Sequence, residues 1–461
     1  MFKKLAQEKK VGKLVSFICC THVFVSIVKY LYYNKYFFEL IENVAIDLLG
    51  LVLLLLAYVY TKQNKLKDCF HTGIKTYFSR EQILLTVIFF CLLVSCVRSQ
   101  VFVDANSMRI NSLYIKDLFI CSFILFPAGI QFAKHGVGKV VRTCMEISLL
   151  LLSICMAWII GIVFQNKVLY NYQGGGIGML ECNGTLQLKI NCHPNTVGAY
   201  AAFLFLTCIW MLVKSKGLKK VLYVIESAIH FVILALSNSR GAFFAMMCTV
   251  VIIVMVVSCY VIKKYPLLIK LLIGSIAGVG VAALLYFGRS SIFSAYESVR
   301  VVRQVNDVEV DEVIRDINVT SLSGREAIWI NSIKVMFDGP GNFFMGVTPA
   351  RIPKLLQDRL GWEFGVYTHN QILEVATDTG VPAAVAFVVF LCLLALACLK
   401  QGLAPSNDEE WKDKLVILLI FYLIVSNVME ATLLFYGYFS GCMFMVLSGW
   451  VFGREKNIGK D

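Results

Sequence analysis

The sequence predicts an all-α integral membrane protein of about 12 transmembrane helices with one large extracytoplasmic loop. Hydrophobic residues make up 58% of the 461 residues and charged residues only 16%, whereas about a quarter of the residues of soluble domains are charged. Apolar runs of about twenty residues, which can cross a hydrocarbon core of about 30 Å, recur along the chain. Lys and Arg gather in the short turns between these runs.

The apolar runs set the order of the elements. Because a backbone in lipid must satisfy its own hydrogen bonds, we expect each run to be a helix. The first run follows a basic segment without an obvious small-residue cleavage site, so we expect a retained span rather than a removed signal peptide. The predicted spans are residues 14–33, 37–60, 82–103, 114–133, 144–165, 196–213, 218–236, 242–262, 266–288, 381–399, 413–433 and 435–453.

The net charge of +13 lies mainly in turns on one side of the predicted membrane, so it indicates topology rather than nucleic-acid binding. With the N-terminus inside, the inner segments carry 26 Lys and Arg and the short outer loops carry 5. This asymmetry predicts that both termini are cytoplasmic and that residues 289–380 lie outside. We therefore expect an N-terminal transmembrane bundle of about nine helices (1–288), an extracytoplasmic loop domain (289–380) and about three C-terminal helices (381–461).

Two short helices are predicted within the long loop, each from a capping-box pattern. Ser323 and Glu326 open an amphipathic helix that stops at residues 338–341, with Arg325 in its first turn. Thr368 and Gln371 open a second helix, of which His369 would be the first residue. Helix starts bind phosphate and diphosphate groups through free N–H groups and the helix dipole. The alternative is that Arg325 and His369 are ordinary exposed loop residues.

Three polar residues stand out near the predicted spans. Arg240 lies in the outer turn 237–241, against the charge bias, where the alternative to a functional role is a snorkelling interfacial arginine. Glu430 lies near the outer end of its span, and an intramembrane carboxylate is a functional or pairing candidate, with Arg240 as one possible partner. His230 lies deeper, and we expect a hydrogen-bonded core histidine.

The sixteen cysteines are scattered, mostly within apolar runs, and form no set of metal-ligand spacing. The outer loops contain no Asp-x-Asp motif, so we expect a metal-free mechanism and no cofactor. Cys182 and Cys192 are the cysteines predicted to lie outside. Their spacing leaves open whether they form a disulfide or remain free thiols.

Taken together, the motifs resemble those of the O-antigen ligase and O-antigen polymerase family. The resemblance covers about residues 180–400, with the motifs in the family's order and on one predicted face of the membrane. The motifs are His-Pro-Asn-x-x-Gly (193–198), Ser-Arg-Gly (239–241), Gly-Arg-x-x-x-Trp (324–329), a stretch with Gly341 and Gly346, and His-Asn-x-x-Leu followed by Gly380 (369–380).

The resemblance implies a GT-C-like glycosyltransferase of the bacterial cytoplasmic membrane with an undecaprenyl-diphosphate-linked oligosaccharide as donor. By this resemblance, Arg240 and Arg325 would hold the lipid diphosphate, and His369 would orient or deprotonate the hydroxyl of a glycan or lipid-linked acceptor. The compact outer loop leaves the acceptor open. The further substrate-binding candidates are Asn370, Asn195, His193, Trp329 and Glu430.

The chemistry agrees with these roles. A departing diphosphate carries two to three negative charges that need fixed cations, and arginine pairs with phosphate oxygens through two parallel hydrogen bonds. Histidine can accept a proton near neutral pH. The remaining partners are membrane lipids; no nucleic acid is expected.

Other functional classes remain open. A transporter or flippase of lipid-linked sugars should place its charged groups at mid-membrane and show a repeat, whereas here the polar groups collect on one face. A binding or sensory membrane protein is the other alternative. Within the enzyme reading, the acceptor separates a polymerase from a ligase. We favour a capsule or O-antigen polymerase, because no motif in the sequence indicates a terminal anchor as the acceptor.

Overall fold

The computed structural model describes residues 79–99, 104–135, 138–167, 169–170, 176–182, 185–190, 193–262, 264–303, 324–362, 365–403, 414–431, 433–434 and 439–455. The predicted spans 14–33 and 37–60 lie outside these residues, and so does Cys192, on which the predicted disulfide depends.

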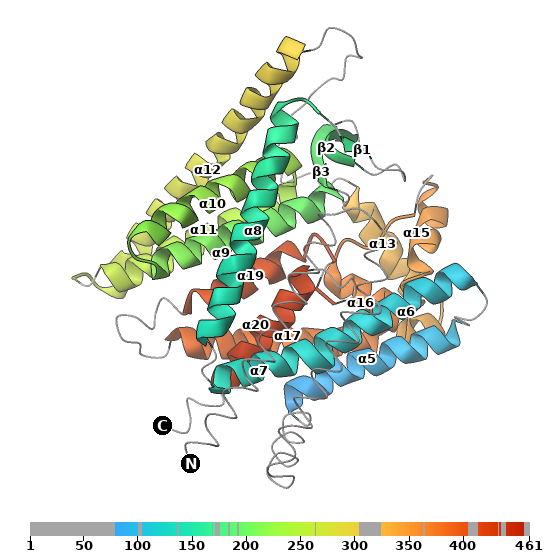
Figure 1. Cartoon of the computed structure of the whole chain (residues 1–461). Coiled ribbons are helices and arrows are strands. Elements are labelled where there is room, and N and C mark those ends of the chain that lie inside the picture. The colour runs from blue at the N-terminus through green and yellow to red at the C-terminus, as the bar shows by residue number, and fades with distance from the viewer. Residues whose placement is uncertain are drawn as a thin grey trace.

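Helices dominate the described residues and pack side by side as a bundle (Figure 1). The bundle consists of α5 (Arg80–Arg98), α6 (Ala105–Phe119), η2 (Ile120–Leu125), α7 (Phe126–His135), α8 (Gly138–Phe164), α9 (Pro194–Lys214), α10 (Leu218–Ser237), α11 (Arg240–Val261), α12 (Leu267–Arg303), α17 (Val381–Leu403), α19 (Val416–Ser426) and α20 (Phe439–Glu455).

Among the described residues, seven helices are long and apolar enough to cross a membrane. They coincide with seven of the predicted spans, which supports a mostly helical polytopic membrane protein; the total of about twelve spans stays a prediction. The seven are Arg80–Arg98, Asn106–Ile130, Pro194–Lys214, Leu218–Ser237, Arg240–Val261, Leu267–Ser298 and Val381–Gly402.

The predicted span 413–433 differs from the structure. It contains α19, a helix of 11 residues, which at about 1.5 Å per residue is far shorter than a hydrocarbon core. The helix ends at Ser426, residues 427–429 form a turn and a bend, and residues 430–431 are irregular. Glu430 therefore lies in an irregular segment beyond α19 and not within a spanning helix, as the sequence pattern predicted.

The outer loop and its neighbours also differ in detail from the prediction. Residues 166–195, predicted as a Gly-rich loop, contain a small antiparallel sheet of order β1-β2-β3. Its strands are β1 (Leu169–Tyr170), β2 (Gly176–Cys182) and β3 (Thr185–Ile190), and Met179 faces Leu188 in the β2–β3 register. Helix α12 continues past the predicted boundary at 288 to Arg303. The three-domain division stays a prediction.

Four short helices cover one end of the bundle (Figure 1). They are α13 (Arg325–Met336), α14 (Pro340–Met345), α15 (Ile352–Leu360) and α16 (Gln371–Thr379). We call this the site end: α5 and α10 finish there, and α9, α11 and α17 begin there. The short helices have a small hydrophobic core of their own, formed by Ile328, Val335, Val347, Ile352, Leu356 and Val366.

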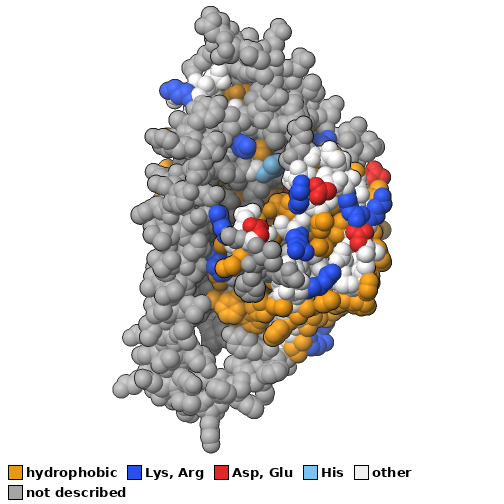
Figure 2. Space-filling view, turned by 90° about the vertical axis from the view of Figure 1, so that its right-hand side faces the viewer, with side chains coloured by type: hydrophobic (Ala, Val, Ile, Leu, Met, Phe, Trp, Pro, Cys, Tyr) orange, Lys and Arg blue, Asp and Glu red, His pale blue; other side chains and the backbone are white. Residues whose placement is uncertain are grey.

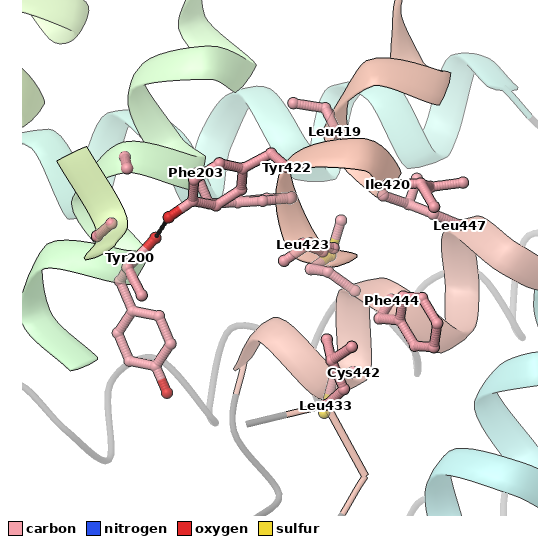
Figure 3. Close-up of a cluster of buried hydrophobic side chains, with 14 of the residues drawn as sticks. Tyr200, Phe203, Leu419, Ile420, Tyr422, Leu423, Leu433, Cys442, Phe444 and Leu447 are labelled. Atoms are coloured by element: carbon pink, nitrogen blue, oxygen red, sulfur yellow. Dashed lines mark hydrogen bonds between the residues drawn. The ribbon is translucent and has the colours of Figure 1, made fainter. Parts of the chain in front are cut away.

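The main core extends through the bundle, and one part of it lies between α9 and the pair α19 and α20, where aromatic and aliphatic side chains pack together (Figure 3). Tyr422 is fully buried there, and its hydroxyl donates a hydrogen bond of 2.9 Å to the carbonyl of Ala199 on α9. This bond satisfies a polar group that would otherwise be costly in an apolar interior. It also ties α19, and hence the segment that follows it, to the start of α9.

Glycines allow the short helices to pack closely on the bundle. Gly346, after α14, has φ +71°, and a Cβ there would lie 2.5 Å from backbone atoms of Asp378 and Thr379. Gly380, before α17, has φ +92°, and its Cβ would lie 2.4 Å from the carbonyl oxygen of Phe344. Since both the backbone conformation and the space exclude a side chain, these glycines fix α14 against the end of α16.

We predict that Gly346→Ala lowers the apparent unfolding temperature of the purified protein in detergent. The substitution combines left-handed strain with a clash against backbone, which together cost about 2 kcal/mol or more. Gly280→Ala in α12 is the matched control, because nothing lies within 4 Å of its Cβ position. A helical Gly→Ala change without a clash should stabilise the protein slightly. Equal unfolding temperatures for the two variants would contradict the close-packing role.

Candidate functional site

The centre of the candidate site is the carboxylate of Glu430. Its Oε1 lies 2.5 Å from Nη2 of Arg325 and accepts a hydrogen bond of 2.7 Å from Nδ2 of Asn195. Its Oε2 lies 3.1 Å from Nδ1 of His369. The structure thus brings together four of the residues predicted from sequence, from four separate segments of the chain.

Hydrogen bonds hold the Glu430 segment against the start of α16. The backbone N–H of Gln371 donates to the carbonyl of Asn427 at 3.1 Å, and the N–H of Leu433 donates to Oε1 of Gln371 at 2.7 Å. Nδ2 of Asn370 donates to the carbonyl of Val428 at 3.1 Å. Glu430 lies between these anchored residues, so its position beside His369 is determined by backbone contacts as well as by its charge.

His369 precedes α16 and has a left-handed backbone, with φ +51°. The N-cap is Asn370, whose side-chain oxygen accepts hydrogen bonds from the N–H groups of Ile372 and Leu373. The predicted helix start at Thr368, with His369 as first helical residue, is therefore wrong by two residues. Asn is at least as good an N-cap as Thr, and capping by Asn370 leaves His369 in the preceding turn. A left-handed non-glycine residue is uncommon and is often found at functional sites.

Arg325 lies in the first turn of α13, as predicted, and is its first residue, but the predicted cap is wrong. The N-cap is Gly324, with φ +77° and no side-chain capping bond, so Ser323 does not occupy that position. Glycine is favoured over serine at this N-cap because the backbone there is left-handed, a conformation that glycine adopts without steric cost. The predicted end of this helix is confirmed, since Phe337 is its C-cap and Asp338 and Gly339 follow.

The start of α9 contributes Asn195 and His193. His193 is the N-cap of α9, and its Nδ1 accepts from the N–H of Asn195 at 3.3 Å. The charges of Glu430, His369, Lys189 and Arg325 all act on His193, which places it at the edge of the same cluster.

The start of α11 lies beside Arg325. A Cβ on Gly241, next to Arg240, would be 3.3 Å from Cβ of Met429 and 3.9 Å from Nη1 of Arg325. The N-cap of α11, Ser239, makes no side-chain capping bond. Arg240 is thus the first residue of a helix whose positive end lies beside the Glu430 cluster. The sequence pattern places Arg240 in the preceding turn.

Close packing also places this turn. A Cβ on Gly198 of α9 would lie 2.4 Å from Cβ of Ser239 and 2.7 Å from Oγ of Ser237. The glycine of the His-Pro-Asn-x-x-Gly motif therefore allows α9 to contact the Ser-Arg-Gly turn. Two motifs that lie more than forty residues apart in the sequence form one side of the site.

The charge of the Glu430 carboxylate is balanced by basic side chains around it. Burial alone would raise the pKa of the Glu430 carboxyl, but the charge and hydrogen bond of His369, then Arg325 and His193, lower that pKa to about 2. Glu430 is therefore ionised at neutral pH. Because a carboxylate can only accept hydrogen bonds, Nδ1 of His369 carries the proton in this contact. When the ring is neutral, Nε2 has the lone pair that can accept another proton.

Two predicted substrate-binding residues have structural contacts. Nε1 of Trp329 donates a hydrogen bond of 3.0 Å to the carbonyl of Thr368, next to His369. The Asn370 amide caps α16 with its oxygen and bonds to Val428 with its nitrogen. Both side chains therefore help to hold His369 and Glu430 in place.

Sequence reasoning missed Arg289, which is almost fully buried in α12. Its Nη2 lies 2.5 Å from Oδ1 of Asn238, and its guanidinium carbon is 5.3 Å from the ring centroid of Phe243. Asn238 is the left-handed residue that ends α10, directly before the turn with Arg240. The sequence feature that could have identified Arg289 is its place as a lone arginine directly after the apolar run 266–288. The sequence pattern places it at the start of the outer loop. The prediction for His230 is confirmed: it is fully buried, and its Nε2 lies 3.1 Å from Oγ of Ser153.

The face that carries these elements is mixed in character. Figure 2 looks onto the site end and shows Lys and Arg side chains around a hydrophobic area, with fewer acidic side chains. Side-chain exposure is 16% for Arg325, 15% for Glu430 and 28% for His369, so a substrate can reach the cluster although it is mostly enclosed. Within the described ranges, no group of three or more His, Cys, Asp or Glu side chains could hold a metal ion.

One comparison with protein families finds a match. Residues 227–388 match the family model described as O-antigen ligase. This segment is 162 of the 461 residues, so the similarity concerns about a third of the chain. No curated protein matches the chain. The matched segment contains Arg240, Arg325, Trp329 and His369 but ends before Glu430. The carboxylate that joins the cluster therefore comes from outside the matched segment.

We predict that Glu430→Gln lowers the apparent unfolding temperature of the purified protein while Glu326→Gln does not. The first change leaves Arg325 without its carboxylate and removes the charge that sets the tautomer of His369. Loss of one partner of an enclosed ion pair costs about 3–5 kcal/mol. Glu326 is exposed and adjacent to Arg325 in the sequence, so Glu326→Gln removes the same charge without breaking the contact. Equal unfolding temperatures for the two variants would contradict the central role of Glu430.

Proposed function

We propose that this protein is a metal-independent membrane glycosyltransferase that transfers a glycan from an undecaprenyl-diphosphate carrier to an acceptor hydroxyl. The observation that carries the proposal is the contact of one carboxylate, Glu430, with both Arg325 and His369. The match of residues 227–388 to the O-antigen ligase family supports the same class of reaction. The site would face the extracytoplasmic side of the bacterial cytoplasmic membrane, with both termini in the cytoplasm.

The cationic side of the site suits a diphosphate. Arg325 uses Nη2 for Glu430, and the start of α11 with Arg240 lies next to its Nη1. The backbone N–H groups at the start of a long helix, together with guanidinium groups, stabilise phosphate oxygens. As the bond between the sugar carbon and the diphosphate oxygen breaks, the negative charge that develops on the leaving group would be stabilised here without a metal.

The opposite side of Glu430 suits the acceptor. The acceptor hydroxyl would attack the anomeric carbon, forming the new carbon–oxygen bond, and its proton would pass to Nε2 of His369. Glu430, on Nδ1, would stabilise the imidazolium that results. One carboxylate would thereby orient the group that binds the leaving diphosphate and the group that activates the nucleophile.

Polymerase and ligase differ in the acceptor. We favour a capsule or O-antigen polymerase, in which the acceptor is another lipid-linked repeat unit; the alternative is a ligase that transfers to a terminal anchor. A transporter of lipid-linked sugars would not need the His369–Glu430 contact, which positions a proton acceptor. In cells, deletion of the polymerase leaves single repeat units on the surface, whereas deletion of a ligase leaves full-length polymer on the carrier.

Variants at three positions test the roles. Arg325→Lys or Arg240→Lys should weaken donor binding together with turnover, because a point charge cannot reproduce the planar guanidinium. His369→Ala should keep donor binding and lose transfer by about 10²–10⁴-fold. Arg351→Lys, on an exposed residue of the same loop, is the control.

Donor binding and transfer by each purified variant are the measurements. Normal transfer by His369→Ala beside inactive arginine variants would exclude histidine as the base. Normal donor binding by both arginine variants would exclude the diphosphate clamp.

A further inference from the structure

A buried carboxyl group behind the site has no role in the chemistry described so far. Glu374 lies on α16, one turn after the helix start, and is fully inaccessible to solvent. An ionisable group in such a position is costly unless its hydrogen bonds compensate for lost hydration. Its contacts therefore indicate what it is retained for.

The side-chain hydrogen bonds of Glu374 in the described part of the chain go to one residue, Thr368, directly before His369. Oε2 of Glu374 accepts a hydrogen bond of 3.2 Å from the backbone N–H of Thr368, and it also accepts from the Thr368 hydroxyl. On the other side, the carbonyl of Thr368 accepts from Nε1 of Trp329 at 3.0 Å. Backbone donor, backbone acceptor and side chain of this fully buried threonine are all engaged.

The residue after His369 is fixed as well, because the Asn370 side chain caps α16 and bonds to Val428. His369 is thus held between two immobilised neighbours, in a left-handed conformation that a histidine seldom adopts without such support. If Thr368 were released, the backbone at His369 could relax, and the 3.1 Å contact of its Nδ1 with Glu430 would be lost.

A second buried carboxyl group on the same helix does not share this arrangement. Asp378 lies one turn further along α16 and is also fully buried, but neither of its carboxyl oxygens has a hydrogen-bond partner in the described part of the chain. Burial, and then the charge of Glu374, raise the pKa of Asp378 well above its usual value. Glu374 differs in its contacts rather than in the direction of its shift: burial raises its pKa to about 7, while the two donors of Thr368 act to lower it. Its Oε1 has no hydrogen-bond partner in the described part of the chain, so the bonds to Thr368 through Oε2 are what distinguish it from Asp378.

We propose that Glu374 is a positioning residue for the transfer reaction: by binding the N–H and hydroxyl of Thr368, it holds His369 in the left-handed turn that directs its imidazole to Glu430. This inference rests on the proposed function for its activity readout but not for its geometry. Glu374 would not touch substrate and would act only through His369.

The test uses the purified full-length protein with Glu374→Met, Thr368→Val, Thr368→Ser and Asp378→Leu. Glu374→Met has similar length but no oxygen acceptor for the N–H and hydroxyl of Thr368, whereas glutamine would keep an acceptor oxygen. Glu374→Met and Thr368→Val should lower the transfer rate by about 10- to 100-fold, as small misplacements of a reacting group do, with donor affinity unchanged. Thr368→Ser keeps the hydroxyl and should restore the rate. Asp378→Leu also removes a buried carboxyl group from the same helix and is the matched control, so it should keep the wild-type rate.

A second readout does not need activity. The rate at which diethyl pyrocarbonate modifies His369, followed by mass spectrometry, should rise in Glu374→Met because the imidazole leaves Glu430. The rate at His193 should stay the same, and Asp378→Leu should change neither. Absence of transfer by the wild-type protein, with the labelling pattern as expected, would reject the proposed function and keep the positioning role. Wild-type labelling and transfer by Glu374→Met would overturn the positioning role, as would equal losses in Glu374→Met and Asp378→Leu.

Discussion

The arrangement of the site end depends on one ionised carboxylate, Glu430, which is mostly enclosed by the chain. A charge in such a position is tolerated only when partners replace the water that it loses. Arg325, His369 and Asn195 replace it, and they come from α13, from the turn before α16 and from the start of α9. Since no two of these residues are close in sequence, the carboxylate is also the point at which three parts of the chain are held in register.

This requirement explains why regular structure stops where it does. Helix α19 ends at Ser426, and the irregular residues after it carry Glu430 to the start of α16, where Gln371 and Asn370 bind their backbone. Glycines on the facing elements allow this close approach. The missing side chain of Gly198 leaves room for the turn with Ser239, and that of Gly241 leaves room for Met429. Close backbone packing and the charge of Glu430 therefore have the same effect. Each fixes the distance between groups that would act on a single substrate.

The sequence predicted the bundle better than the site. Apolar length alone locates α9, α10, α11 and α17, because lipid allows few alternatives to a spanning helix. It failed for residues 413–433, since hydropathy does not reveal that Asn427 and the residues beyond it pair with α16. The capping boxes were misread for a related reason. Several residues in each motif can cap a helix, and the choice of Gly324 and Asn370 depends on tertiary contacts.

The candidate residues were recognised one by one, but their connections were not. Sequence motifs singled out Arg325, His369 and Glu430, yet the pairing of Glu430 with Arg325 depends on the path of the chain in three dimensions. Glu374 left no sequence signal at all, because an acidic residue in the first turn of a short helix is ordinary. Its significance comes from complete burial and from its bonds to Thr368.

A cysteine pair at Gly241 and Met429 tests most directly whether the start of α11 and the Glu430 segment meet. The Cβ position of Gly241 lies 3.3 Å from Cβ of Met429, close to the separation of about 3.5–4.5 Å found in disulfides. The double variant Gly241→Cys with Met429→Cys should form a disulfide under mild oxidation, identified by mass spectrometry of the linked peptides, whereas either single variant should not form that link. If both introduced thiols are alkylated freely under the same conditions, the segments do not meet, and Glu430 does not join Arg240 and Arg325 in one site.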